Sequence, residues 1–199
     1  MKRIVVTLDG IGLASLSAVV AGMLACGGSS SPTAPATAPT EPTTANTLVY
    51  SAPTVAGYQL VQDSSSTATH LILDLVGPAG TQLKGVLLTL STDATRAAWG
   101  NPGGALDPYL NPGQALALGT GAKLLKGTVS GATLQAALYQ KGSVTAATLG
   151  TQPILSVALD LKPGALTGGI ALTPGLTQIL DATGKTQIIN VAAGSLSAK

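Results

Sequence analysis

Apolar side chains recur at every second position along several short stretches of this chain. In "HLILDLV", which begins at His70, the residues Leu71, Leu73 and Leu75 share one side of an extended chain. The stretches "KGVLLTLS" and "PILSVALDL" repeat the spacing, and "TLQAALYQ", "GGIALT" and "TQILDATGKTQIINV" are shorter examples. Because successive side chains of a strand point to opposite faces, this period predicts strands that bury one face. The stretches between them are rich in Gly, Pro and Asn, which favour turns.

The residues available for a core point to the same fold class. The chain has 199 residues with 25 Gly and 12 Pro, while Phe is absent and aromatic residues make up only 3%. A core must therefore be built from Val, Ile, Leu and Ala. Helical surfaces usually carry many Glu and Lys side chains, but Glu41 is the only Glu in this sequence. We expect an all-β sandwich or barrel with roughly eight to ten strands.

The first 25 residues have the pattern of a signal peptide. Lys2 and Arg3 provide a positive start, and the uncharged run "IGLASLSAVVAGML" follows from Ile11 to Leu24. This run is shorter than the roughly 20 residues that a membrane-spanning helix needs. The residues before Cys26 resemble the lipobox of bacterial lipoproteins, with Ala25 and Cys26 matching that motif. The resemblance implies cleavage between Ala25 and Cys26 and acylation of the Cys26 thiol and its new amino group.

Lipidation would make Cys26 a membrane anchor, because more than one acyl chain gives stable attachment. Gly27 follows the cysteine without an Asp that would resemble an inner-membrane retention signal. By family resemblance the expected location is the cell envelope, as an outer-membrane lipoprotein facing the periplasm or the cell surface. Residues 26–45 are rich in Pro, Thr, Ser and Ala, and we expect a disordered tether before a domain at 46–199. The alternatives are a chance cysteine in an ordinary cleaved signal or an uncleaved anchor.

Charge and motif content argue against several functional classes. The formal net charge is +2 without a basic stripe, so nucleic acid is not an expected partner. One cysteine and one histidine, Cys26 and His70, support neither a disulfide nor a metal site. The "GKT" of "ATGKT" lacks the earlier glycine of a P-loop, because Ile179 stands there. No nucleophile motif accompanies His70 and Asp74. We therefore expect neither an enzyme nor a bound cofactor.

Two aromatic residues stand out in a loop rich in Gly and Pro. Trp99 is the only tryptophan, and Tyr109 follows ten residues later, between the turn sequences "NPG" at 101–103 and 111–113. Both side chains are candidates for a binding surface, since aromatic rings stack on sugars and anchor partner proteins. The alternative is that Trp99 closes one end of the sandwich as part of the core.

The order of strands and turns between residues 70 and 199 is similar to that of cohesin domains. The resemblance is carried by "ILDLVGPAGTQLKGVLLTLSTDATRAAW" and by the ending "ILSVALDLKPGALTGGIALTPGLTQILDATGKTQIINVAAGSLSA". It implies a jelly-roll or immunoglobulin-like β-sandwich, in the same broad group as some carbohydrate-binding modules. Cohesins bind dockerin modules on one face of a sheet. No position matches a diagnostic cohesin motif, so no contact residue is carried over.

These observations together indicate a membrane-anchored lipoprotein that displays a non-catalytic binding domain. The resemblance implies a dockerin-like protein partner, and the aromatic loop leaves a polysaccharide ligand open. A structural envelope component that joins neighbours through its sheet edges is the alternative.

Replacing the anchoring thiol tests the first part of this hypothesis. We expect Cys26→Ser to abolish labelling of the protein by radioactive palmitate in growing cells, because the acyl acceptor is gone. Labelling of the variant equal to that of the wild type would contradict lipidation at Cys26.

Overall fold

The computed structural model describes residues 41–116, 123–140 and 144–199. Ala25 and Cys26, with the expected signal peptide and most of the expected tether, lie outside the described residues. Trp99 and Tyr109 lie inside them. Residues from Thr40 to Lys199 form one compact unit.

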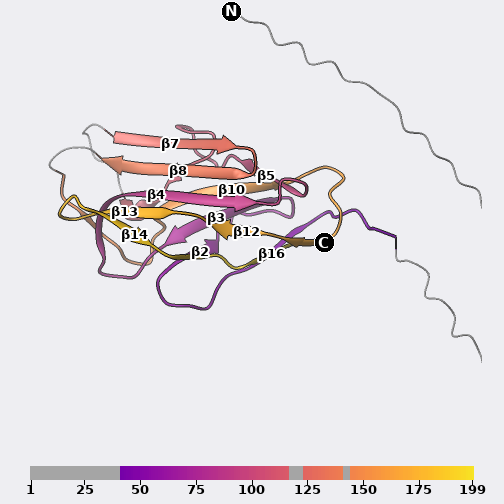
Figure 1. Ribbon diagram of the computed structural model, residues 1–199, viewed down its shortest axis with the longest axis horizontal. Helices are drawn as coiled ribbons and strands as arrows, with labels where there is room; N and C mark the ends of the chain where they lie inside the picture. The colour runs from indigo at the N-terminus through magenta and orange to yellow at the C-terminus, as the bar shows by residue number, and fades with distance from the viewer. Residues whose placement is uncertain (1–40, 117–122, 141–143) are drawn as a thin grey trace, which may run out of the picture. The chain divides into compact units, whose positions relative to one another are not determined.

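The larger of the main sheets has strand order β14-β13-β4-β8-β7, with two short strands pairing on β4. Figure 1 shows β7, β8, β4 and β13 one below another, with β3 and β10 of another sheet behind them. The strands of this sheet are β4 (Gln82–Thr92), β7 (Lys123–Ser130), β8 (Thr133–Gln140), β9 (Ala147–Thr148), β12 (Leu172–Pro174), β13 (Thr177–Asp181) and β14 (Thr186–Ile189). All their pairings are antiparallel.

The second main sheet has strand order β15-β2-β3-β10-β5, and β6 also pairs with β10. Its strands are β2 (Tyr58–Gln62), β3 (His70–Val76), β5 (Ala97–Gly100), β6 (Asn111–Pro112), β10 (Leu155–Leu161) and β15 (Val191–Ala192). β15 runs parallel to β2, whereas the other pairs are antiparallel. A short 3-10 helix, η1 (Gln114–Leu116), follows β6.

A small third sheet joins the two ends of the described chain. It contains β1 (Leu48–Ser51), β11 (Gly168–Ile170) and β16 (Ser195–Ala198), with β16 in the middle. Upstream of β1, Ala45 N–H donates to the carbonyl of Ala165 at 2.7 Å, and Thr44 forms a β-bridge with Leu166. Contacts of the domain therefore begin before Asn46, the boundary expected from sequence, and the chain enters beside its own C-terminal strand.

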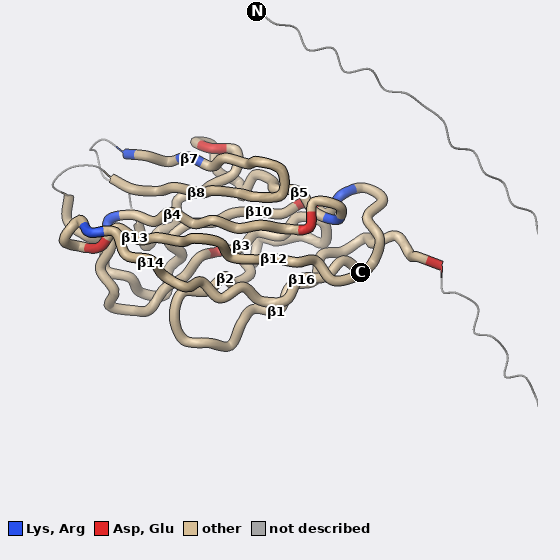
Figure 2. Tube along the Cα trace, viewed as in Figure 1, with Lys and Arg blue, Asp and Glu red and all other residues tan. Residues whose placement is uncertain are grey.

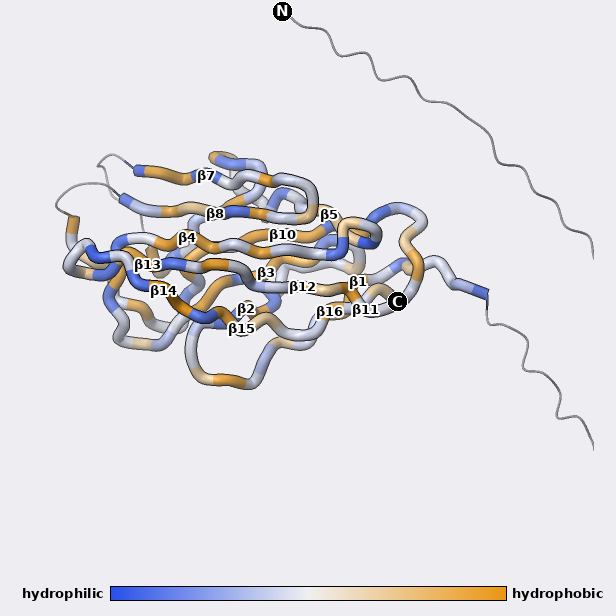
Figure 3. The backbone as a smooth tube through the Cα atoms, viewed as in Figure 1, coloured by the Kyte–Doolittle hydropathy of each residue, from blue (hydrophilic) through white to orange (hydrophobic). Residues whose placement is uncertain are grey.

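The core is built from leucine, as the absence of Phe predicts. Hydrophobic residues recur along β3, β4 and β10 (Figure 3). On β4, Leu88 and Leu90 have no exposed surface, whereas Leu87 and Thr89, which alternate with them, are partly exposed. On β3, Leu73 and Leu75 are also fully buried. The predicted all-β sandwich and the predicted inward faces of these strands are confirmed.

The described residues contain sixteen strand segments, more than the sequence led us to expect. The expected strand "GGIALT" accounts for part of the difference, because it is divided between β11 of the small sheet and β12 of the larger sheet. A bulge follows β12. β12 and β13 both pair with β4, but Gly175 and Leu176 interrupt them. Thr89 is the one β4 residue opposite this interruption, and its carbonyl accepts the Gly175 N–H at 2.8 Å. The extra residue of this bulge leaves the Leu176 side chain exposed.

A buried polar pair lies on the outer side of the second sheet. Asp74 is 7% exposed and accepts a hydrogen bond of 2.6 Å from the Ser156 hydroxyl. Burial raises the pKa of Asp74, and the nearby negative charge of Asp63 adds to the rise. Hydrogen bonds from Ser65 lower the pKa of Asp63. The fold thus shifts the pKa values of Asp74 and Asp63 in opposite directions.

Asp74→Asn tests this arrangement. Because its pKa is raised in the folded state, Asp74 contributes most to stability at low pH, and the contribution falls as pH rises through the raised value. An Asn side chain cannot ionise and still accepts the Ser156 hydroxyl. We expect the variant to gain stability relative to the wild type as pH rises from about 4 to about 8 in urea unfolding.

Asp93→Asn is the matched control with the opposite sign. The Thr95 hydroxyl and backbone N–H, with Arg96, hold the pKa of Asp93 below its usual range. Asp93→Asn should therefore be less stable than the wild type at neutral pH. The difference in the free energy of unfolding should close as pH falls through the lowered pKa. If the stability difference between Asp74→Asn and the wild type did not change with pH, the raised pKa of Asp74 would be contradicted.

Candidate docking surface

Trp99, one of the two predicted binding residues, lies in the core. Its side chain on β5 is 8% exposed, and the indole N–H donates to the carbonyl of Ala132 at 2.9 Å. Ala132 is in the turn between β7 and β8 of the other main sheet. Trp99 therefore ties the two sheets together and has no open ring face for stacking on a ligand.

Tyr109 is partly buried against the core, in a loop that supports the edge of β7. The carboxylate of Asp107 accepts the Tyr109 N–H at 2.8 Å and the Gly127 N–H at 2.9 Å. Gly127 is needed at this point of β7, because a Cβ there would lie 2.6 Å from the Cβ of Tyr109. Tyr109 thus has a structural contact that the sequence did not reveal, and so does Asp107.

A partly exposed apolar surface lies on the outer face of the larger sheet, meaning the side that points away from the core. The pairing register places the outward residues in rows across the strands. One row contains Leu180, Gly85, Tyr139 and Leu124, and the next contains Ile188, Gln178, Leu87, Ala137 and Lys126. Their neighbours on the inner side, such as Val86 and Leu138, belong to the core.

A hollow of about 400 Å³ lies on this outer face. Its lining is mostly apolar and includes Leu87, Leu124, Ala137, Tyr139 and Leu180 around Gly85. Gly85 has no side chain to fill the space, and a Cβ there would lie 2.2 Å from the Cβ of Tyr139. The sheet therefore requires glycine at this position, which lines the hollow.

An exposed apolar side chain extends the same surface. Ile188 is 69% exposed on β14. Ile188 lies opposite Gln178, beside the hollow. A contiguous apolar area rimmed by polar groups is typical of a site that binds another molecule.

The outer side of the second sheet is different. β3 and β10 are buried on both sides, since the outward residues Ile72, Asp74, Ser156 and Ala158 are all less than 9% exposed. Their polar members bond to one another, as the Ser156 to Asp74 contact shows. The larger sheet is therefore the main sheet whose central strands keep a partly exposed apolar outer side.

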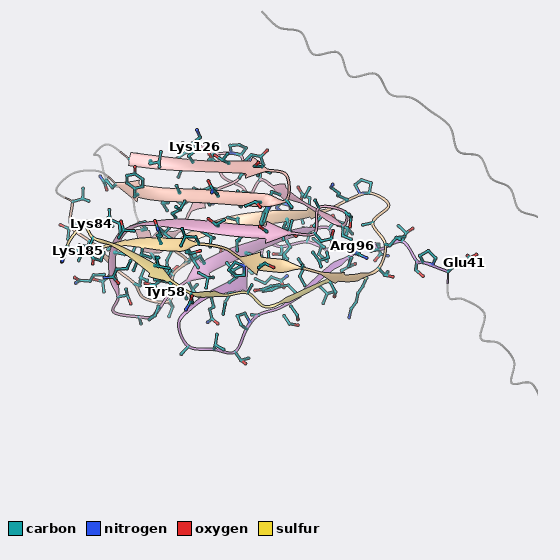
Figure 4. The ribbon with its side chains drawn as sticks, viewed as in Figure 1. Glu41, Tyr58, Lys84, Arg96, Lys126 and Lys185 are labelled. Carbon is teal, nitrogen blue, oxygen red and sulfur yellow. The ribbon has the colours of Figure 1, made fainter. Side chains whose placement is uncertain are left out.

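Lysines lie on two sides of the hollow, at one end of the sheet and on β7. Figure 2 shows no charge along the middle of β13, β4 and β8, with blue residues on β7 and at one end of the sheet. They include Lys126 on β7, Lys84 on β4 and Lys185 in the turn between β13 and β14 (Figure 4). Lys84 is the extra residue of a bulge, because Gly85 pairs with Leu180 and Leu83 pairs with Asp181. Within the described residues none of these lysines forms an ion pair.

Asp181 is the one acidic residue at this end of the sheet, and its oxygens already have partners. They accept hydrogen bonds from Thr183, from the Lys185 N–H and from the Gln187 amide. These contacts, led by the Thr183 hydroxyl, hold the pKa of Asp181 at about 2. The sequence "ATGKT" is therefore part of a hairpin turn whose backbone is organised by Asp181.

His70 is paired with a residue of the neighbouring strand. His70 Nδ1 lies 2.5 Å from Asp160 Oδ1, its register partner on β10, and not near Asp74. Among residues 41–116, 123–140 and 144–199, no three His, Cys, Asp or Glu side chains come together as metal ligands. No helix in those ranges is long and apolar enough to span a bilayer.

Comparison with known proteins shows the fold. No family model matches the sequence, and no curated protein matches it. Several solved structures from Acetivibrio cellulolyticus are similar. The second type II cohesin module of the adaptor scaffoldin ScaA has a TM-score of 0.56 and 10% identity over 72% of this chain and 90% of its own.

Two further structures agree with this match. A chain of a type II cohesin–X-dockerin complex has a TM-score of 0.54 and 11% identity, covering 69% of this chain and 94% of its own. A type II cohesin domain from the cellulosome has a TM-score of 0.51 and 11% identity, covering 71% and 94%. The described domain therefore has the all-β sandwich fold of type II cohesins.

Proposed function

We propose that this protein is a non-catalytic docking lipoprotein, which holds a partner protein on the outer face of its larger sheet. The observation that carries the proposal is the open apolar hollow over Gly85, bordered by Leu87, Leu124 and Leu180. Leaving such side chains in water costs roughly 25 cal/mol for each Å² of apolar surface, which a partner would recover by covering them. Covering this surface with a partner therefore contributes favourable binding free energy.

The similar structures support a protein partner. One of them is a type II cohesin in complex with an X-dockerin, and that name describes the other protein. For this chain we infer a dockerin-like partner, meaning a protein module that docks by its side chains on one sheet face. A polysaccharide ligand loses its main support, because Trp99 is buried and hydrogen-bonded to Ala132.

The anchor completes the proposal. Cys26, acylated after cleavage at Ala25, would hold the protein in the membrane, and residues 27–40 would act as a spacer. The described chain then enters the domain at Thr44, beside β16 and Lys199. This arrangement would display the domain in the cell envelope, from the outer membrane, on either its periplasmic or its external side.

A charge placed on the outer face tests the proposal. We expect the soluble chain from Gly27 to Lys199 to retain a protein from envelope extracts of its own organism. Leu87→Asp should reduce retention by about tenfold or more, because a buried unpaired carboxylate is costly at an interface. Retention is measured by quantitative mass spectrometry of the eluted proteins.

Val55→Asp is the matched control, since Val55 is 52% exposed in the loop between β1 and β2. It introduces the same charge at an exposed valine away from the outer face and should retain the partner as the wild type does. Equal retention by wild type and Leu87→Asp would contradict docking on this face. A chain that retains no protein but forms oligomers broken by Leu87→Asp would favour the structural envelope role instead.

A further inference from the structure

We infer that the partner inserts one apolar side chain into the hollow over Gly85 and places carboxylates around it, against Lys84, Lys126 and Lys185. This inference rests on the proposed function and adds the chemistry of the partner. It follows from three properties of the outer face: its shape, the satisfied backbone beneath it and the sign of the charges at its rim.

The hollow has the size and lining of a site for a single anchor. Its volume of about 400 Å³ is at the small end of the range found for binding pockets. Leu87, Leu180 and Leu124 provide apolar walls, and the polar groups of Gln178 and Thr186 lie at its border. Interfaces commonly concentrate their binding energy on one large side chain seated in such a pocket.

The backbone beneath the hollow is already paired. β13, β4 and β8 each have a neighbouring strand on both sides. Their N–H and C=O groups are used within the sheet, so a partner cannot bind here by adding a strand. Contact must be made through side chains, and Ala137 and Gly85 are small enough to let a partner side chain approach the sheet.

The lysines at the rim of the hollow indicate that the partner carries negative charge there. Lys126 pairs directly with Ala137, and Lys84 precedes Gly85. Lys185 lies in the turn next to Thr186, which borders the hollow. Figure 4 shows Lys84 and Lys185 at one end of the sheet and Lys126 on its β7 edge. Since no ion pair within the described residues engages them, their charges are available to carboxylates of a partner.

Selection from a library tests the inference without knowledge of the natural partner. The probe is a phage-displayed library of two-helix miniproteins with randomised residues on one helix, selected against the soluble chain 27–199. We expect the selected helices to carry one Leu, Ile, Met or Phe flanked by Asp or Glu. Their affinity should fall as sodium chloride is raised from about 0.05 to 0.5 M, because salt screens exposed charges.

Two sets of variants test the apolar anchor and the carboxylates separately. Ala137→Leu fills the hollow and should weaken the selected binders by roughly tenfold, whereas Ala56→Leu in an exposed loop should leave them unchanged. Replacing Lys84, Lys126 and Lys185 together by Gln should weaken the binders and remove most of their salt dependence.

The outcomes separate this inference from the proposed function. Some binders could be lost with Leu87→Asp and yet be neither acidic nor sensitive to Ala137→Leu. Such binders would overturn the apolar anchor and its flanking carboxylates, but docking on the outer face would stand. Binders insensitive to Leu87→Asp would overturn docking itself. A library that yields no binder for the outer face would also count against the inference.

Discussion

The pairing of β4 on both of its sides is the interaction on which the rest of the domain depends. Its eleven residues pair with β8 along one edge and with β13 and β12 along the other, and its start also pairs with β9. The inner residues Leu83, Leu88 and Leu90 are fully buried and fix the register, since a slip of one residue would turn them outward. The same register places Gly85 and Leu87 on the opposite side.

One constraint therefore produces both the core and the candidate site. The core uses leucine where aromatic residues are lacking, and Trp99 closes it by bonding to the β7–β8 turn. On the outer side, the close approach of β8 at Tyr139 excludes any side chain at residue 85, which lines the hollow. The second sheet keeps no comparable surface, because β3 and β10 are buried on both sides. The fold thus leaves one main sheet available for docking.

The sequence predicted the local elements better than the site. Alternation in "HLILDLV" and "KGVLLTLS" identified the inward faces, because period two is a local property of a strand. The hairpin at "DATGKT" was likewise readable from its turn residues. The sequence left open whether Trp99 binds a ligand or belongs to the core. The answer depends on its hydrogen bond to Ala132, a residue far along the chain. The Gly85 hollow and the Asp107 contact with β7 also require the register of distant strands, which one sequence does not contain. Cys26 and its lipid remain a prediction from the lipobox resemblance.

Methyl NMR spectra of the domain, recorded with and without the partner protein that it retains, test the docking surface most directly. Docking on the outer face predicts that the methyl signals of Leu87, Leu124, Leu180 and Ile188 shift or broaden. The signals of Val55 and Leu106, which are exposed in loops, should stay unchanged. Shifts confined to Val55 or Leu106, with the outer-face leucines unaffected, would contradict the proposal that this protein binds its partner on the larger sheet.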